Sequence, residues 1–239
     1  MSELVLSLFP GGGLLDHAFE REGFCVVRGP DPIWGGDIRT FHPPAGRFDG
    51  IIGGPPCPSH SRLRHTIEVN AYRPADDLIA EFARVVTATE CGWFLCENAP
   101  ASPVPDVPGF HVTTQLVSNR LLGEVQNRIR RISFGNRARP VELQIPQDGP
   151  EPEHFEHVVT SDARPVPVAI GGSGKRKPGA DLPKRSLGDS LQLQGFPEDW
   201  LAHQPWTMQA KRKIVGNGVA LPMGRALARA IREAMSAES

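Results

Sequence analysis

Residues 4–27 read LVLSLFPGGGLLDHAFEREGFCVV, and this stretch decides the fold. The apolar run at residues 4–9 predicts a buried strand, and the proline and three glycines at 10–13 predict a tight turn after it. Apolar residues at helical spacing follow over residues 14–22. A second apolar run at residues 24–27 predicts another strand. The order strand, turn, helix, strand is typical of α/β proteins with a parallel sheet.

The same alternation continues toward the C-terminus. Residues 49–52 predict a third strand, residues 76–90 an amphipathic helix and residues 93–96 a further buried strand. Residues 126–134 read as a hairpin strand, and residues 222–235 as an amphipathic helix. We therefore predict a doubly wound α/β sheet with polar side chains at the carboxyl ends of its strands.

Composition limits the possible functions. The chain has 239 residues and a net charge of −1, which excludes a generally basic nucleic-acid binder and confines phosphate attraction to local patches. Its four cysteines form no C-x-x-C pair and complete no zinc pattern with histidines, so we expect reduced thiols and no metal. No apolar run approaches the length of a membrane span. These features predict a cytoplasmic protein without membrane contact.

Two strand ends carry reactive side chains. Residues 53–58 read GGPPCP, so Cys57 follows a predicted strand in a rigid turn that would hold its thiol toward a cleft. Cysteine is the strongest side-chain nucleophile near neutral pH when it is ionised, although a lone cysteine is more often inert packing. Glu97 and Asn98 follow the strand at 93–96. A glutamate at that place either shuttles a proton or faces water.

The first turn and the residues after the second strand suggest a nucleotide-type ligand. Glycines at 11–13 let a ligand approach the backbone, and the following helix offers free N–H groups. Asp31 stands where a carboxylate commonly accepts bonds from ribose hydroxyls. Asp37 would accept from an adenine amino group. Each of these features also occurs as an ordinary turn or a solvated loop.

Six stretches, taken together and in this order, resemble the motifs of the DNA (cytosine-5) methyltransferase family. They are LFPGGG at 8–13, PC at 56–57, EN at 97–98, QNRIR at 126–130, LQGFP at 193–197 and GNGV at 216–219. The resemblance covers nearly the whole chain. It implies a Rossmann-like, S-adenosylmethionine-dependent methyltransferase sheet. It also divides the chain into a catalytic core at 1–135, a small, loop-rich target-recognition region at 136–184 and a segment at 185–239 that returns to the core.

The resemblance also implies the chemistry. Cys57 would add to C6 of a cytosine flipped out of duplex DNA, which activates C5 for methylation. Glu97 would donate at N3, which requires its carboxyl group to be protonated part of the time. Arg130 would bind O2 and orient Glu97, and Arg128 would support Cys57 and the base. Asn98 would hold its loop.

The family pattern further assigns cofactor and DNA contacts. The residues implied for S-adenosylmethionine are Phe9, Gly11, Gly12, Gly13, Asp31, Asp37, Ile38, Pro56 and Asn217, with Trp34 as an extra aromatic that stacks on adenine or only packs. The residues implied for DNA are Ser61, Arg62, Arg64, Lys175, Arg176, Lys177 and Gln194. Arginines at 128–139 are expected to form one basic cluster, which would bind phosphates.

Several alternatives stay open. The same residues would serve methylation of cytosine in tRNA, or transfer of another alkyl group from a modified cofactor. A catalytically inactive DNA-binding homologue is the alternative from a different class. We expect a monomer that acts on double-stranded DNA, with a cognate restriction endonuclease among its candidate partners. The sequence does not reveal the bases that are recognised.

Overall fold

The computed structural model describes residues 3–56, 78–156, 158–161 and 185–236. Six strands form one sheet in the order β2-β1-β3-β4-β6-β5. Their bounds are β1 Leu4–Leu8, β2 Cys25–Arg28, β3 Gly50–Gly53, β4 Trp93–Asn98, β5 His111–Ser118 and β6 Ile129–Asn136. The first four strands are parallel, whereas β6 is antiparallel to both β4 and β5. The predicted Rossmann-like α/β fold is confirmed, and its sheet is mixed.

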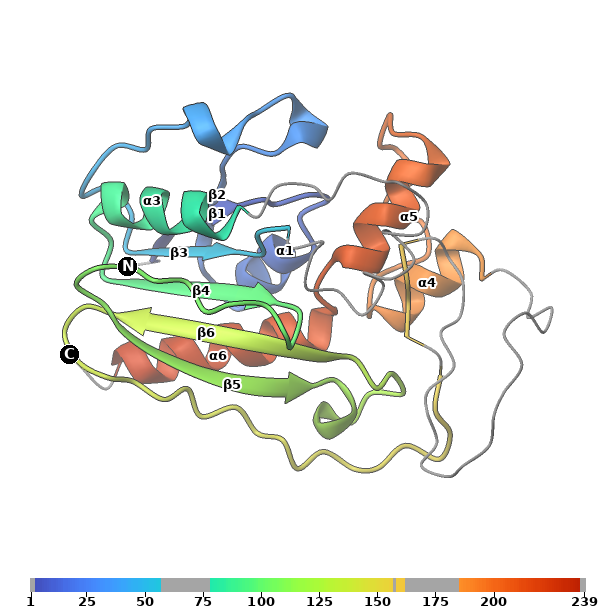
Figure 1. Ribbon diagram of the computed structural model, residues 1–239. Coiled ribbons are helices and arrows are strands. Elements are labelled where there is room, and N and C mark those ends of the chain that lie inside the picture. The colour runs from blue at the N-terminus through green and yellow to red at the C-terminus, as the bar shows by residue number, and fades with distance from the viewer. Residues whose placement is uncertain (1–2, 57–77, 157, 162–184, 237–239) are drawn as a thin grey trace.

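Helices cover both faces of this sheet (Figure 1). Helices α1 (Leu14–Arg21) and α6 (Leu221–Ser236) pack on one face, and α3 (Ile79–Thr89) packs on the other. Strands β1, β3 and β4 are almost wholly buried, as expected for parallel strands that are covered on both sides. This burial explains why they read as continuous apolar runs in the sequence.

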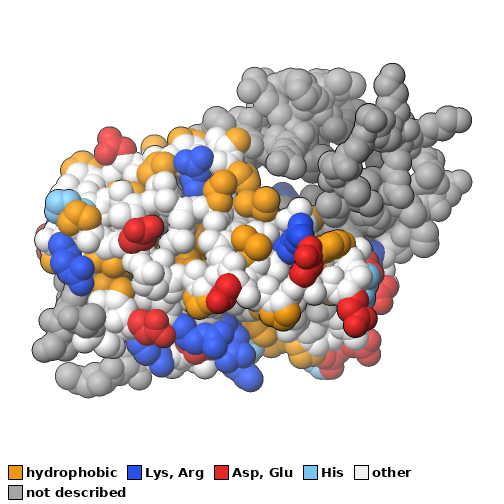
Figure 2. Space-filling view, turned by 90° about the horizontal axis from the view of Figure 1, so that it is seen from below, with side chains coloured by type: hydrophobic (Ala, Val, Ile, Leu, Met, Phe, Trp, Pro, Cys, Tyr) orange, Lys and Arg blue, Asp and Glu red, His pale blue; other side chains and the backbone are white. Residues whose placement is uncertain are grey.

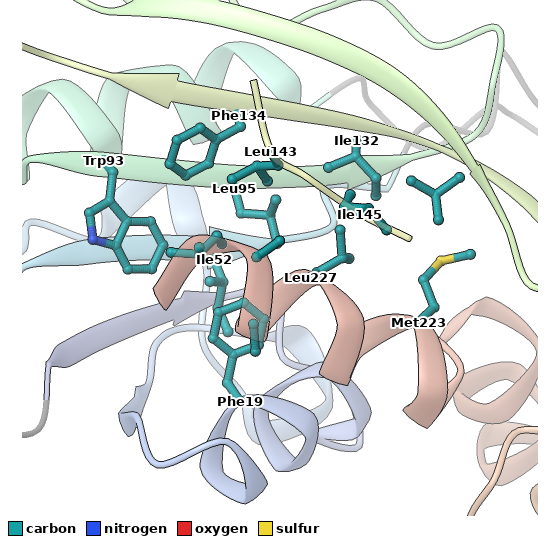
Figure 3. Close-up of a cluster of buried hydrophobic side chains, with 14 of the residues drawn as sticks. Phe19, Ile52, Trp93, Leu95, Ile132, Phe134, Leu143, Ile145, Met223 and Leu227 are labelled. Atoms are coloured by element: carbon teal, nitrogen blue, oxygen red, sulfur yellow. The ribbon is translucent and has the colours of Figure 1, made fainter. Parts of the chain in front are cut away.

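The larger core lies between the sheet and the pair α1 and α6 (Figure 3). Trp93 and Leu95 of β4 point into it and contact the cluster that contains Phe19 of α1 and Leu227 of α6. Successive residues of a strand point to opposite faces, so Phe94 belongs to the second core beneath α3. By the same alternation Glu97, two residues beyond Leu95, lies on the α6 side.

Three elements were not predicted from the sequence: β5, α4 (Leu187–Leu193) and α5 (Met208–Asn217). Helices α4 and α5 lie beyond the end of the sheet at which the parallel strands finish (Figure 1). They pack with Leu14 of α1 and with Val159 in a third apolar cluster. The C-terminal segment therefore returns to the core at the end of the sheet where the reactive side chains were expected.

Part of the region at 136–184 packs against the core. Val141, Leu143 and Ile145 are buried in the α6-side cluster. The carbonyls of Val141 and Leu143 accept hydrogen bonds from the side chains of Thr113 and Gln115 on β5, at 2.6 and 3.0 Å. This extended segment runs along the outer edge of the sheet, because side chains of β5 bind its backbone. Residues 162–184 lie outside the described part of the chain.

Candidate active site

The loops that follow β3 and β4 are joined by one side chain. Asn98 donates a hydrogen bond from Nδ2 to the carbonyl oxygen of Pro55, at 3.0 Å. Its Oδ1 accepts from the backbone N–H of Ala99 and from the Ser102 hydroxyl, both at 2.8 Å. These two donors fix the orientation of the amide, so Nδ2 must face Pro55. Asn98 thus anchors the chain two residues before Cys57, which itself lies outside the described residues.

Glu97 and Arg130 form an ion pair in which Nε lies 2.6 Å from Oε1. The two side chains are only 7% and 20% exposed, with Arg130 the more accessible. Glu97 pairs with Ile132 in the antiparallel ladder, so Arg130, two residues from Ile132, is its diagonal neighbour on the same face. Oε1 is buried and accepts no aligned hydrogen bond from the described residues. Its charge is paired with that of Arg130.

The loop after β3 passes close to this carboxylate. A Cβ atom added at Gly54 would lie 3.1 Å from Oε2 of Glu97. The backbone at Gly54 and the carboxylate are therefore in direct contact distance, and the next residues lead to Pro56 and Cys57. Pro56 is exposed. Among the described residues, the ends of β3 and β4 therefore lie side by side, as expected.

Arg128 is placed differently from the sequence expectation. Its side chain is 2% exposed and donates to the carbonyl oxygens of Val159, Gly216 and Gly218, at 3.2, 3.0 and 2.9 Å. Burial lowers the pKa of its guanidinium, and the charge of Arg130 lowers it further, while Glu97 raises it. The carbonyl dipoles compensate for the lost hydration. Arg128 is thus engaged with backbone rather than presented at a surface.

The glycine turn after β1 is held from the segment that follows β2. Asp31 accepts from the N–H of Gly11 at 2.9 Å, and Trp34 donates from its indole N–H to the Gly11 carbonyl at 3.1 Å. Phe9 and Gly11 both have positive φ, at 56° and 53°. A Cβ atom at Gly11 would meet nothing within 4 Å. The turn is fixed on one side and has open space on the other.

The second glycine of the turn is packed closely, and the third adopts a left-handed backbone conformation. A Cβ atom at Gly12 would lie 2.5 Å from the Ile214 side chain of α5, and one at Gly13 would lie 2.4 Å from the guanidinium of Arg28. Gly13 also has φ 77° as the residue that caps α1. Gly12 thus allows α5 to approach the turn, and Gly13 allows α1 to start there.

The other residues expected at a cofactor differ in exposure. Asp37 is half exposed and caps a short 3-10 helix, η2 (Ile38–Thr40), by accepting from the N–H of Arg39. Ile38 is buried in the core beneath α3, so the structure turns its side chain away from any surface. Asn217 is exposed at the C-terminal end of α5. Trp34 is 48% exposed and meets Trp206 edge to face, with ring centroids 4.9 Å apart.

The structure leaves open the position of most residues that were expected to contact DNA. Ser61, Arg62, Arg64, Lys175, Arg176 and Lys177 lie outside the described residues. The structure does place Gln194, and its buried position disagrees with the predicted contact with DNA. Its side chain has no exposed surface and donates to the carbonyls of Val215 and Gly218, at 2.8 and 3.2 Å. A side chain that is buried in this way is not accessible to a duplex.

In the expected basic cluster at 128–139, three arginines bind backbone carbonyls of separate segments: Arg128, Arg131 and Arg137. Arg131 donates twice to the carbonyl of Pro100, at 3.0 and 2.6 Å. Arg137 donates to the carbonyl of Cys91 and lies over the ring of Phe110. On the face shown in Figure 2, basic side chains intermingle with acidic ones. These arginines fix loops instead of forming one phosphate-binding surface.

Ser102 and Gln126 had no assigned role in the sequence analysis, and Arg131 was expected only as part of the basic cluster. Arg131 and Gln126 act through partners more than 30 residues away, whereas Ser102 binds Asn98, four residues earlier. Only the QNRIR motif, which contains Gln126, singled out one of the three. Among the described residues, no group of three His, Cys, Asp or Glu side chains is placed to hold a metal ion. None of the described helices is long and apolar enough to cross a membrane.

Comparisons with known proteins show what the chain is similar to. The family model for C-5 cytosine-specific DNA methylases matches residues 33–101, a range that contains Cys57, Glu97 and Asn98. Type II methyltransferase M.NgoPII of Neisseria gonorrhoeae is 30% identical over 148 residues, which cover 53% of this chain and 38% of that protein. Type II methyltransferase M.FnuDI of Fusobacterium nucleatum is 30% identical over 162 residues, covering 56% and 46%. The chain thus spans less than half the length of either relative.

Solved structures support the fold. The Entamoeba histolytica methyltransferase EhMeth and the S. pombe Dnmt2 methyltransferase each superpose with a TM-score of 0.63 at 11% identity. Both superpositions cover 98% of this chain and 99% of the other chain. At this identity the likeness concerns the fold alone. The ordered motifs, the matched range and the two bacterial relatives together make the chain similar to C-5 cytosine-specific DNA methylases.

Proposed function

We propose that this protein is a DNA (cytosine-5-)-methyltransferase. It transfers a methyl group from S-adenosylmethionine to C5 of a cytosine flipped out of duplex DNA, through a covalent bond between Cys57 and C6. The observation that carries the proposal is the buried pair of Glu97 and Arg130, clamped beside the loop that leads to Cys57. A protonated carboxyl group and a guanidinium on one face would match the N3 and O2 edge of cytosine, because both then donate hydrogen bonds.

The glycine turn fits the proposed cofactor. Gly11 leaves open space where a side chain would stand, and Asp31 and Trp34 hold its peptide from behind. Asp31 keeps acceptor capacity for a ribose, since each of its oxygens is engaged by only one N–H. Asp37 and Asn217 are exposed. S-adenosylmethionine would supply an electrophilic methyl group on its sulfonium.

The residues of the chain would act on the base in turn. The Cys57 thiolate forms a bond to C6, and the electron pair of the C5–C6 double bond moves into the ring toward N3 and O2. Glu97 donates a proton or hydrogen bond at N3 and Arg130 donates at O2, so the developing negative charge is stabilised. C5 becomes nucleophilic and gains the methyl group. Loss of the C5 proton then restores the double bond and expels Cys57.

The wider setting belongs to the same proposal. Duplex DNA is the substrate, the protein acts as a monomer in the cytoplasm, and a restriction endonuclease that recognises the same sequence is a candidate partner. The family model for C-5 cytosine-specific DNA methylases supports the DNA substrate, and the type II names of the two bacterial relatives support the candidate endonuclease. Recognition of specific bases is assigned to the target-recognition region at 136–184.

Transfer of a radiolabelled methyl group tests the proposal. We expect label from S-adenosylmethionine to enter plasmid DNA and not tRNA, and bisulfite sequencing of the plasmid to give the methylated site. Cys57→Ala should abolish transfer, whereas Cys25→Ala, which changes an exposed cysteine on β2, should retain it. Label on tRNA alone would contradict the proposal that duplex DNA is the substrate. Transfer by Cys57→Ala would overturn the mechanism.

A trapped intermediate tests the covalent step directly. A duplex that carries 5-fluorocytosine at the methylated position has no C5 proton to lose, so the protein should stay bonded to C6. We expect a protein–DNA band that survives boiling in detergent, for the wild type and for Cys25→Ala but not for Cys57→Ala. Methylation of the normal duplex without any trapped band would contradict the adduct.

A further inference from the structure

Three buried side chains, Gln126, Arg128 and Gln194, form a polar network that we call the carbonyl hub. Each is at most 2% exposed. Gln126 Nε2 lies 3.4 Å from Gln194 Oε1, and both Gln194 and Arg128 donate to the carbonyl of Gly218. Buried polar groups of this kind are costly unless they are paired, so the network favours the arrangement of segments that supplies its carbonyl partners, although Nε of Arg128 has no partner among the described residues.

The first segment held by the hub is the turn between α5 and α6. Arg128 donates to the carbonyl of Gly216 at 3.0 Å, and Gln194 donates to that of Val215 at 2.8 Å. These carbonyls belong to the last turn of α5, where a helix leaves its carbonyls without partners. The hub caps α5 from the side and thereby fixes the position of Asn217.

The second segment is the stretch that precedes residues 162–184. Val159 is held at both ends of its backbone: its N–H donates to Oε1 of Gln126 at 3.1 Å, and its carbonyl accepts from Arg128 at 3.2 Å. A Cβ atom at Gly216 would lie 2.2 Å from the backbone nitrogen of Ser161. The two segments therefore touch backbone to backbone, and the absence of a side chain at Gly216 makes this contact possible.

The third segment joined to the hub is strand β6, which carries Arg130. Arg128 is the residue immediately before β6, and Arg130 of the Glu97 ion pair lies two residues along the same strand. We propose that Arg128 is a positioning residue that sets the Asn217 turn against β6 and so controls affinity for the cofactor, without contacting the base. This inference rests on the proposed function for its cofactor, and it replaces the expectation that Arg128 supports Cys57.

Hydrogen exchange tests the hub without any ligand. In Arg128→Met we expect the amides at 159–161 and 215–219 to exchange at least tenfold faster, while those of β1 keep their wild-type rates. Arg131→Met is the matched control, because Arg131 donates two bonds to the single carbonyl of Pro100 and stands outside the hub. Unchanged exchange at both segments in Arg128→Met would overturn the positioning role.

Calorimetric titration with sinefungin, an analogue of S-adenosylmethionine that cannot transfer a methyl group, tests the consequence. We expect Arg128→Met to raise the Kd at least tenfold, Gln194→Met to raise it less, and Arg131→Met to leave it within twofold of wild type. At saturating cofactor, the single-turnover rate of Arg128→Met should stay within about threefold of wild type. If Arg128→Met does not fold, Gln194→Met decides by the same two measurements.

The outcomes separate the two proposals. Faster exchange together with an unchanged sinefungin Kd would mean that the hub only stabilises the fold, and would overturn this inference. An unchanged Kd with a large loss of single-turnover rate would return Arg128 to direct catalysis. A wild-type protein that binds no sinefungin would overturn the proposed function, whereas the exchange experiment would still decide whether Arg128 holds the two segments.

Discussion

The substitution Asn98→Asp replaces the amide that joins the loops after β3 and β4 with a carboxylate of the same shape. Both acceptor bonds of Oδ1 persist, but the donor that faces the Pro55 carbonyl at 3.0 Å becomes a second oxygen. The lost hydrogen bond and the unsatisfied carbonyl together cost about 2 kcal/mol. If that strain is relieved by movement of the loop that carries Cys57, the rate of methyl transfer falls about thirtyfold.

Single-turnover transfer of radiolabelled methyl groups to plasmid DNA, with the protein in excess, measures this rate, and urea unfolding measures the stability. Ser102→Ala is the matched control. It removes one hydrogen bond to the same amide but keeps the donor toward Pro55, so it should cost no more than about 1 kcal/mol, or about fivefold in rate. Equal rates for Asn98→Asp and Ser102→Ala would refute the reasoning, since the donor to Pro55 would then have no special importance.

Three further predictions concern the fold and the cofactor turn. Burial raises the pKa of Asp16 above its ordinary value of 3.8, although hydrogen bonds from Ser7 and Arg28 oppose the shift. The stabilising contribution of Asp16 is then complete below that value and is lost as pH rises through the folded-state pKa. Above about pH 4, the free energy of unfolding of wild type should therefore fall relative to that of Asp16→Asn, by at most about 1.4 kcal/mol per pH unit. Urea unfolding between about pH 4 and pH 7 checks this, and a constant difference would contradict it. Gly11→Ala should lower the free energy of unfolding by about 1 kcal/mol, because Gly11 has a positive φ. Calorimetry should also show weaker sinefungin binding, since the added methyl group enters the open space beside the turn. Leu227→Ala should lower the free energy of unfolding by about 2–5 kcal/mol, because the side chain is fully buried; a smaller loss would mean that the core collapses around the cavity.

The strands and helices with a strong apolar pattern could be predicted from the sequence to within a few residues. Strand β1, helix α1 and helix α6 are examples, since each buries one continuous face. Strand β5 was missed because only its last two residues are buried, so it has no continuous apolar run. Helix α4 had a readable signal, because Ser186 and Asp189 form a capping box at its start.

The site was predictable where chemistry and strand ends coincide. Glu97 and Asn98 follow an apolar strand, and the structure brings them beside the loop that leads to Cys57. Arg128 and Gln194 were assigned to wrong surroundings because charged and amide side chains are usually exposed. Their carbonyl partners come from segments between 21 and 90 residues away, so no local pattern reports them.

The antiparallel register between β4 and β6 has a consequence for folding accuracy. Arg130 is followed by Arg131, so a strand that slipped by one residue would still offer a guanidinium to Glu97, and charge alone does not distinguish the two alignments. The apolar side chains do: a slip would turn Phe134 away from α6 and set it near Phe94, where Gly135 now leaves room for that ring. The packing of side chains remote from the reacting base therefore disfavours the slipped register. A bulky substitution at Gly135 should impair methyl transfer, although Gly135 contacts none of the groups that perform it.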